Sequence, residues 1–415
     1  MSTSQLTPVP PHVPPHLVLD FDFFAVPPGL RDPFDKWQAL VDTGAPPIFW
    51  SPRNGGHWTF LGYDAIREAY RNHESFSNRH QSIPKTEGWP VLQPNGVDPP
   101  EHSKFRNLLT PLFTPAAIAS LQGEIRRRTW VLLDDFVADG HCDFVAQFSG
   151  KLPTGLFIHL MGMDEGRLGE FIALADFFMR VEDPAAKAQN AREIYGLLDE
   201  FFRAKTAHLG DDIASLLIRT RDTLGSGVSH EEVINCAFLL FVAGLDTVTS
   251  TMTCIWRYLA TATDARRQIA GCLSQPNELN RAIEELIRFY AVSSIYRRVT
   301  KDMTFKGVTL KQDEMVVLPD NLANRDPAVF DRPRDIDLGR KVNPHLTFGL
   351  GVHRCIGSHL AKLEISTALQ EWLPRIPDFR LVEREPIKIF AGPVMGFRSL
   401  PLAWEVQAAK VLMRS

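Results

Sequence analysis

The chain has 415 residues, of which 44% are hydrophobic, and carries a formal net charge of −4 with an isoelectric point near 6.4. This slightly acidic balance argues against non-specific nucleic-acid binding by the chain as a whole. The five cysteines are odd in number and form no C-x-x-C pair. That pattern excludes a disulfide scaffold or a zinc ribbon and suits a reducing cytosol.

Residues 1–34 form a proline-rich arm that we expect to be extended or irregular. The arm has neither the basic region nor the apolar region of a signal peptide. The longest apolar run, residues 236–245, is too short to cross a bilayer, which needs ~20 apolar residues. We therefore expect a cytoplasmic protein that does not span a membrane.

The first predicted elements are a β-hairpin over residues 47–61, with a glycine turn, and a short helix at about 63–72. Residues 77–98 show no clear period and predict a long ordered loop, and such loops are usually functional. The apolar spacing then becomes helical. Helices are predicted from residue 100, over 117–137, and over 150–162, 166–178 and 187–208.

A longer helix is predicted to begin at Ser229, which forms a capping box with Glu232, and to run to about residue 260. It is apolar nearly all round and should therefore be buried. Short strand-like pieces follow after residue 297, at 303–310, 315–318 and 379–382. Length alone suggests two or three domains. No linker separates two cores, so we predict one mainly α-helical domain with small β-sheets over residues 1–415.

The most specific stretch is residues 348–357, FGLGVHRCIG, which precedes an amphipathic helical pattern. It predicts a glycine-rich loop that delivers Cys355 to the start of that helix. The free N–H groups and dipole of a helix start lower a thiol pKa and favour thiolate, the form that binds metals. The alternative is an inert buried cysteine. The flanking glycines and the basic neighbours His353 and Arg354 favour the activated form.

This stretch resembles the haem-binding loop of the cytochrome P450 haem-thiolate monooxygenases, with Phe, two Gly, a basic residue, Cys and Gly in register. The resemblance implies the P450 fold, a helical bundle around haem b, with Cys355 as the axial iron ligand. It further implies that Phe348, Gly349 and Gly357 contact the cofactor and that His353 faces a haem propionate.

Residues 243–247, AGLDT, lie in the middle of the predicted central helix. A mid-helix glycine costs about 1 kcal/mol, and a buried aspartate costs more unless it is paired. We expect Thr247 to bond the carbonyl of Ala243 and bend the helix, which opens a groove for a diatomic ligand. By resemblance, Ala243 lies against the haem, while Thr247 and Asp246 supply protons for O–O cleavage.

Glu285 and Arg288 lie three residues apart on one predicted helix face. Taken alone, such a spacing is most often a surface ion pair. The resemblance assigns these two residues to a buried structural Glu-x-x-Arg pair below the haem. It also implies a third partner, which could be Arg325 or Arg340.

Arginine offers two parallel hydrogen bonds to a carboxylate and is suited to bind a haem propionate. His102 and Arg106 are one helical turn apart and point the same way. Arg297 lies in a stretch that matches the propionate-binding strand of the family. Together with His353, these residues are the four predicted propionate anchors.

The resemblance also maps a substrate pocket that is nearly all apolar and suits a compact hydrophobic molecule. Its predicted residues are Trp89, Leu239, Val242, Ala243, Ser293 and Val394. A closer resemblance, to the bacterial camphor-hydroxylase subfamily, rests on residues 244–248, 98–101 and 371–379 and implies a cyclic terpenoid substrate. The loop before Asp98 lacks the tyrosine that bonds the camphor ketone, so a less polar or larger terpenoid, such as a cineole or an ionone, is expected.

The chain has no flavin or iron–sulfur motif, so its electrons must arrive from outside. The resemblance implies a [2Fe–2S] ferredoxin with an NAD(P)H-dependent reductase, docked on a basic face by salt-sensitive association. The predicted basic residues are Arg67, Lys104, Lys341, Arg354 and Lys362. Two alternatives remain, a peroxide-driven peroxygenase of the same fold and a non-catalytic haem carrier or sensor. The Asp246-Thr247 pair counts against the first, and the expected buried apolar pocket and oxygen-groove residues count against the second.

Overall fold

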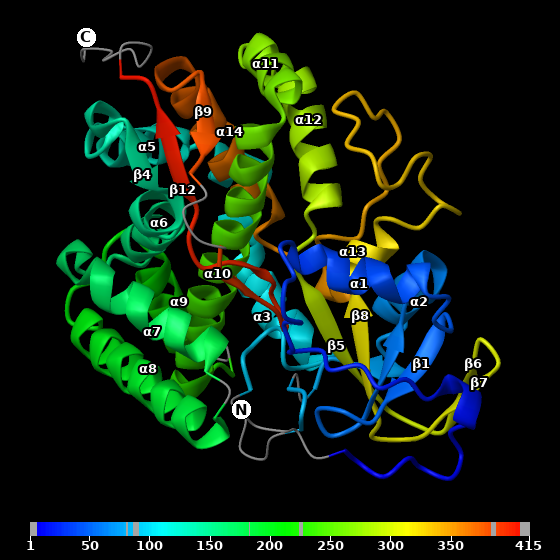
Figure 1. Ribbon diagram of the computed structural model, residues 1–415. Helices are drawn as coiled ribbons and strands as arrows, with labels where there is room; N and C mark the ends of the chain where they lie inside the picture. Colours follow the sequence, from blue (N-terminus) through cyan, green and yellow to red (C-terminus); the bar gives the residue numbers. More distant parts are fainter. Residues whose placement is uncertain are drawn as a thin grey trace.

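The computed structural model describes residues 6–79, 82–85, 91–181, 183–223, 227–382 and 387–406. Its helices are α1 (Pro33–Asp42), α2 (Tyr63–Arg71), α3 (Glu101–Leu109), α4 (Pro115–Ala119), α5 (Gln122–Asp134), α6 (Lys151–Met161), α7 (Leu168–Arg180), α8 (Pro184–Lys205), α9 (Ile213–Asp222), α10 (His230–Thr261), α11 (Thr263–Cys272), α12 (Pro276–Phe289), α13 (Asp320–Ala323) and α14 (Ser358–Arg375). In Figure 1, α10 runs through the middle of the molecule, with α5 to α9 on one side and a β-sheet with α1 and α2 on the other. The fold is mainly helical, as the sequence predicted.

The main sheet has the strand order β1-β2-β8-β5-β3, in which only the β2–β8 pair is parallel. Its strands are β1 (Ile48–Ser51), β2 (His57–Phe60), β3 (Phe76–Ser77), β5 (Ser294–Val299) and β8 (Met315–Pro319). The β1–β2 hairpin confirms the predicted one, and its turn requires glycine. Gly56 has φ +81°, and a Cβ there would lie 2.6 Å from the Trp50 ring.

The described residues also form three smaller sheets. They comprise β6 (Met303–Phe305) with β7 (Val308–Leu310), β4 (His141–Asp143) with β12 (Pro401–Trp404) and β9 (Phe379–Leu381), and β10 (Ile389–Phe390) with β11 (Gly396–Phe397). The predicted strand at 303–310 is therefore a hairpin. The single helix predicted over 117–137 is wrong, because α4 ends at Ala119 and α5 begins at Gln122. The Ser120 hydroxyl bonds the Ala117 carbonyl 2.7 Å away and competes with helix continuation.

The long helix α10 begins with the predicted capping box. The Glu232 amide donates to the Ser229 hydroxyl at 3.1 Å, and the Glu232 carboxylate accepts from the Ser229 amide at 2.7 Å. Among the described residues, α10 is the one helix long and apolar enough to cross a membrane, but 67% of its most apolar window is buried inside the protein. It is therefore the central helix of this fold.

The apolar core divides along α10. The residues of α10 from Val233 to Leu245 pack with α6 to α9 in one cluster, which we call the upper cluster. Those from Val248 to Ala260 pack with α12, α14 and the sheets in a second, lower cluster. The change from one cluster to the other falls between Leu245 and Val248, so two large apolar clusters of the described residues share this helix.

The N-terminal arm is held against the lower cluster. Phe21 and Phe23 are buried there. The buried ammonium of Lys36 donates to the carbonyl oxygens of Asp22 at 2.5 Å, Phe23 at 3.1 Å and Ala25 at 2.6 Å. One lysine thus satisfies three carbonyls of a segment that has no regular structure of its own.

Candidate active site

The cysteine loop, residues 348–357, leads to α14 as predicted. The Cys355 amide donates to the Phe348 carbonyl at 2.8 Å and closes the loop. Gly351 has φ +75°, and a Cβ there would lie 2.8 Å from the Tyr70 carbonyl oxygen of α2. Glycine at this position lets the loop approach α2 closely, which fixes where Cys355 is held.

The electrostatics of Cys355 differ from the prediction. Its side chain is exposed, but loss of hydration in the surrounding site is the largest influence and raises the thiol pKa above its usual value. The amides of Gly357 and Ser358 and the charges of Arg106 and Arg354 act in the opposite direction. The helix start favours thiolate, as expected, but in the protein alone it does not outweigh the loss of hydration around the sulfur.

The middle of α10 is accessible although most of the helix is buried. Ala243 and Gly244 are exposed, Thr247 is half-buried and Asp246 is buried. The Thr247 hydroxyl donates to the Ala243 carbonyl at 2.8 Å, which confirms the predicted bond. Thr251 repeats this bond one turn later, with a 2.8 Å contact to the Thr247 carbonyl.

Both elements reach the junction of the two apolar clusters. Phe348, before the cysteine, packs against the lower cluster, and Ile356, after it, packs against the upper one. The exposed residues of α10 lie where the helix passes from one cluster to the other. The junction between Leu245 and Val248 is therefore a place where a flat apolar group could be held between α10 and the cysteine loop.

The four predicted anchors come together from α3, β5 and the cysteine loop. The rings of His102 and His353 lie 4.4 Å apart, and His102 and Arg297 are buried. Arg106 is close enough to His102 and Cys355 to shift the pKa of both groups. Among the described residues, neither ring nitrogen of His353 makes a hydrogen bond, although its Nε2 lies 3.5 Å from an Asp98 carboxylate oxygen.

The charge at these anchors resides on the arginines. Burial, followed by the charges of His353 and Arg106, lowers the pKa of His102 to about 4, and burial also lowers the pKa of His353. Both imidazoles are therefore neutral at pH 7 in the protein alone and can donate hydrogen bonds without a full charge. Arg106 and Arg297 provide two guanidinium groups, which match the two carboxylates of a porphyrin.

The Glu285 network is buried, as the resemblance implied, and the third partner is Arg340. Glu285 and Arg288 are 0% exposed and form two parallel hydrogen bonds of 2.8 Å. Arg340 adds a third at 2.8 Å, and the Asp337 amide a fourth at 2.8 Å. Arg325 instead donates to the carbonyl of Phe289, so it is not the third partner.

The predicted pocket residues are only partly brought together. Ser293 and Val394 face each other in an isolated β-bridge, and Val394 belongs to the lower cluster. Val242 belongs to the upper cluster, and Leu239 is half-buried on the same helix. The pocket residues thus come from both sides of the junction. Trp89 lies outside the described residues.

The predicted basic face is reduced by ion pairing. Lys104 pairs with Glu232 at the start of α10 at 3.0 Å, so its charge is already balanced, and the structure does not support it as a docking cation. Lys362 likewise pairs with Glu284 at 2.8 Å. Arg354 and Lys341 are exposed, and Arg67 is half-buried on α2. The exposed cation nearest in sequence to the cysteine is therefore Arg354.

The sequence interpretation missed a buried pair beside these anchors. The Tyr70 hydroxyl donates to Asp320 at 2.5 Å, and the Arg297 guanidinium lies 5.1 Å from the Tyr70 ring. The available signal was Asp320 itself, an acidic residue directly after the apolar strand β8. An acid that follows a buried strand indicates a buried polar contact.

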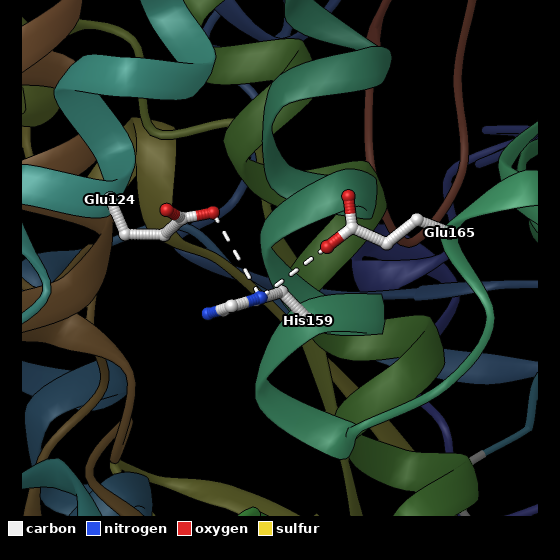
Figure 2. A group of neighbouring side chains, drawn as sticks. All are labelled: Glu124, His159 and Glu165. Atoms are coloured by element: carbon white, nitrogen blue, oxygen red, sulfur yellow. Dashed lines mark ion pairs between the residues drawn. The ribbon is translucent and has the colours of Figure 1, made fainter.

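Figure 2 shows another group, Glu124, His159 and Glu165, whose possible ligand atoms lie within 4.8 Å of one another. The His159 Nδ1 atom is 3.9 Å from Glu124 and 3.3 Å from Glu165. Arg128 pairs with both carboxylates, at 2.6 Å from Glu124. Its guanidinium already supplies the positive charge that a metal ion would bring, so we interpret this group as a surface ion-pair cluster.

Comparison with known proteins decides the family. Residues 272–400 match the family described as Cytochrome P450. Over 410 residues, 96% of this chain and 97% of the relative, the chain is 33% identical to a probable cytochrome P450 127A1 from Sinorhizobium fredii. The chain belongs to the cytochrome P450 family. It is also 30% identical over 385 residues, 90% of the chain and 91% of the relative, to the cytochrome P450 monooxygenase PikC of Streptomyces venezuelae.

Solved P450 structures have the same fold as this chain. The crystal structure of CYP101J2 superposes with a TM-score of 0.85 at 31% identity and that of CYP101C1 with 0.85 at 30%, each covering 96% of this chain and 100% of the other. The P450 is therefore close to the CYP101 group, and it is an oxidoreductase that carries haem. The site fits that cofactor, since the buried His353 Nδ1, which has no hydrogen-bond partner among the described residues, and two arginines lie beside a cysteine loop at the cluster junction.

Proposed function

We propose that this P450 hydroxylates a C–H bond of a small hydrophobic cyclic terpenoid, in the cytoplasm, with O₂ and electrons from a [2Fe–2S] ferredoxin. The observation that carries the proposal is the shared position of Cys355 and the Ala243–Thr247 turn, where Ala243 and Gly244 are exposed, at the junction of the two apolar clusters. A thiolate and a hydroxyl on opposite elements, with apolar walls around them, suit oxidation of an apolar molecule.

Cys355 is the residue that would hold the haem iron through its sulfur. The amides of Gly357 and Ser358 and the nearby Arg106 stabilise its negative charge, and a bound metal ion would complete deprotonation. When bound, the haem supplies the activation of O₂. We assign the two propionates to Arg106 and Arg297 as cations and to His102 and His353 as hydrogen-bond donors. Phe348, Gly349, Gly357 and Ala243 are the proposed apolar contacts of the cofactor.

Thr247 and Asp246 are the proposed proton-delivery residues. The Thr247 hydroxyl now donates to the Ala243 carbonyl. Rotation about its Cα–Cβ bond would turn the proton toward the site, while its lone pairs can accept one from water. Asp246 adjoins it and is buried on the same helix turn, so it can replace the proton that Thr247 passes on.

The substrate class follows from the proposed walls. Val242, Leu239 and Val394 are apolar, and Ser293 contributes one hydroxyl beside Val394. Such a lining binds by shape and burial of apolar area rather than by charge. The likeness to the two CYP101 structures supports a terpenoid. On the cysteine side, exposed Arg354 and Lys341 support an acidic electron donor.

The decisive experiment is spectroscopic. Purified holoprotein should show the thiolate-type spectrum of the reduced carbon monoxide complex, and Cys355→Ser should lose it while still folding. Titration with a panel of cyclic terpenoids should then displace the water ligand in the oxidised spectrum. The observation that none of them alters the spectrum would refute the substrate class. Absence of the thiolate-type spectrum in the wild-type holoprotein would refute Cys355 as the haem ligand.

Electron supply and turnover are tested separately. With a ferredoxin and its reductase, NAD(P)H consumption should depend on a terpenoid that shifts the spectrum and should yield one hydroxylated product. Thr247→Val keeps the side-chain shape but removes the hydroxyl, so the rate of product formation should fall about a hundredfold, at the lower end of the range for a lost general-acid group. Thr251→Val, which removes the hydroxyl that makes the same kind of bond one turn later on α10, is the matched control and should stay within about twofold of wild type.

A further inference from the structure

Tyr70, at the end of α2, connects three parts of the proposed cofactor site. Its carbonyl oxygen would be 2.8 Å from a Cβ at Gly351, and its ring would be 3.8 Å from a Cβ at Gly349, so it is packed under the cysteine loop. The same ring lies 5.1 Å from the Arg297 guanidinium. Its hydroxyl donates to Asp320 at 2.5 Å. The ring is almost fully buried, so these contacts exclude water from between the elements.

Asp320 is a buried acid with incomplete hydrogen bonding. It is 0% exposed at the first position of α13, and its Oδ1 accepts from Tyr70. Its Oδ2 has no hydrogen-bond partner among the residues that the structure describes. The polar groups that act on it are Tyr70 from α2 and Arg297 from β5. Burial outweighs both of them and raises the pKa of Asp320 to about 8.

We propose that Asp320 and Tyr70 are positioning residues for Arg297, and that Asp320 stays uncharged at neutral pH so that the guanidinium charge is directed to the cofactor. This inference rests on the proposed propionate role of Arg297. An ionised Asp320 would compete with the propionate for the same guanidinium. A neutral Asp320 still accepts the Tyr70 hydrogen bond, and so orients the ring on which Arg297 lies.

The charge state of Asp320 also reaches the cofactor electrostatically. Above a pH of about 8 the carboxyl ionises and places a negative charge beside Arg297. A negative charge favours the oxidised, more positive form of a redox centre. At an effective dielectric constant of about 20, a unit charge near a redox centre changes a one-electron equilibrium by on the order of tenfold. A tenfold change corresponds to 59 mV for a one-electron couple.

The test compares the reduction potentials of holoproteins between pH 6 and pH 9.5. Asp320→Asn removes the ionisable group with nearly unchanged shape, and Asp326→Asn is the control, because Asp326 bonds the Tyr63 and Ala328 amides instead. Above pH 8, the reduction potential of wild type should lie below that of Asp320→Asn. The difference should correspond to on the order of a tenfold change in the one-electron equilibrium. Asp326→Asn should follow wild type.

A second measurement follows the protonation of Asp320 directly and does not rely on the reduction potential. Infrared difference spectra between pH 7 and pH 9.5 should show a carboxylic-acid band that disappears in wild type. Burial also raises the pKa of Glu364 to about 8, so Glu364 contributes such a band to wild type and to Asp320→Asn alike. Subtracting the spectrum of Asp320→Asn from that of wild type leaves the band of Asp320. Tyr70→Phe should speed haem transfer to a scavenging apoprotein about threefold or more. Tyr63 lies on the same helix as Tyr70 and bonds the Pro344 carbonyl, so Tyr63→Phe is the control and should leave the transfer rate unchanged.

Equal potential–pH curves for wild type and Asp320→Asn would overturn the charge role. Equal haem-transfer rates for Tyr70→Phe and Tyr63→Phe would overturn the positioning role. Failure of the proposed function is distinguishable from both, because it would appear as loss of the thiolate spectrum in wild type, before any variant is compared.

Discussion

Two buried carboxylates in this P450 are surrounded in different ways. Each oxygen of Glu285 accepts at least two hydrogen bonds, and two guanidinium groups balance its charge. Asp320 is equally buried but has one donor, and its second oxygen has no partner in the described part of the chain. The difference shows what each site can do. A fully compensated charge holds chain segments together, whereas an incompletely compensated acid can change its charge.

The largest expected effect comes from breaking the compensated site. Glu285→Ala leaves Arg288 and Arg340 buried without their carboxylate, which should cost about 3–5 kcal/mol and prevent folding or haem incorporation. The measurement is the yield of soluble holoprotein. Glu278→Gln, an exposed position on the first turn of the same helix, is the control and should give a normal yield. Normal holoprotein from Glu285→Ala would contradict the structural role.

A smaller effect is expected at Arg297, which lies beside Tyr70 and Asp320. The substitution should weaken cofactor binding rather than folding. Arg297→Lys keeps a positive charge but loses the paired hydrogen bonds of guanidinium. Haem transfer to a scavenging apoprotein should be about tenfold faster, equal to about 1.4 kcal/mol, with an unchanged circular-dichroism spectrum. Arg288→Lys, the same change in the Glu285 network, should reduce the folded yield instead. Similar behaviour of the two variants would remove the distinction between the sites.

The pH dependence of stability tests the charge state of Asp320. Because its pKa is raised from 3.8 to about 8 in the folded protein, the folded state binds a proton that the unfolded state has already lost between these values. Wild type should therefore lose stability as the pH rises from 5 to 8. The unfolding free energy of Asp320→Asn, measured in urea, should rise relative to that of wild type by about 4 kcal/mol over this range. A constant difference would show that Asp320 is already ionised at pH 5.

The smallest effect should come from the neighbour of Glu285. Glu284 pairs with Lys362 at 2.8 Å in a partly exposed position, so Lys362→Gln should change the unfolding free energy by only about 0.5–1 kcal/mol. The effect should shrink in high salt, because solvent-accessible charges are screened. A loss as large as that of Glu285→Ala would mean that burial does not separate the two neighbouring acids.

Local patterns were enough to predict the parts of the fold that depend on neighbouring residues. The capping box at Ser229, the Thr247 bond to Ala243 and the glycine-rich loop before α14 are contacts within one turn or loop. The choice of Arg340 over Arg325 could not be predicted, since both lie in one irregular stretch and only the folded chain decides which one reaches Glu285.

The electrostatics of the site were beyond sequence reasoning for the same reason. The helix start at Ser358 predicted a lowered pKa for Cys355, but the amount of water excluded around the sulfur depends on tertiary packing. Likewise, Tyr70 and Asp320 are 250 residues apart, and no local pattern joins them. The four anchors were found through a family resemblance, and their neutral histidines only through burial.

The division of the core along α10 has a consequence for amide hydrogen exchange. The upper cluster consists of helices, with α7 and α8 at the outer edge of the molecule, whereas the lower cluster also contains strands from several sheets (Figure 1). Local opening that separates the outer helices would expose α10 amides up to Leu245 and leave those after Val248 protected. Faster exchange of the α10 amides before Leu245 than of those after Val248 would show that the two halves of the longest helix open independently.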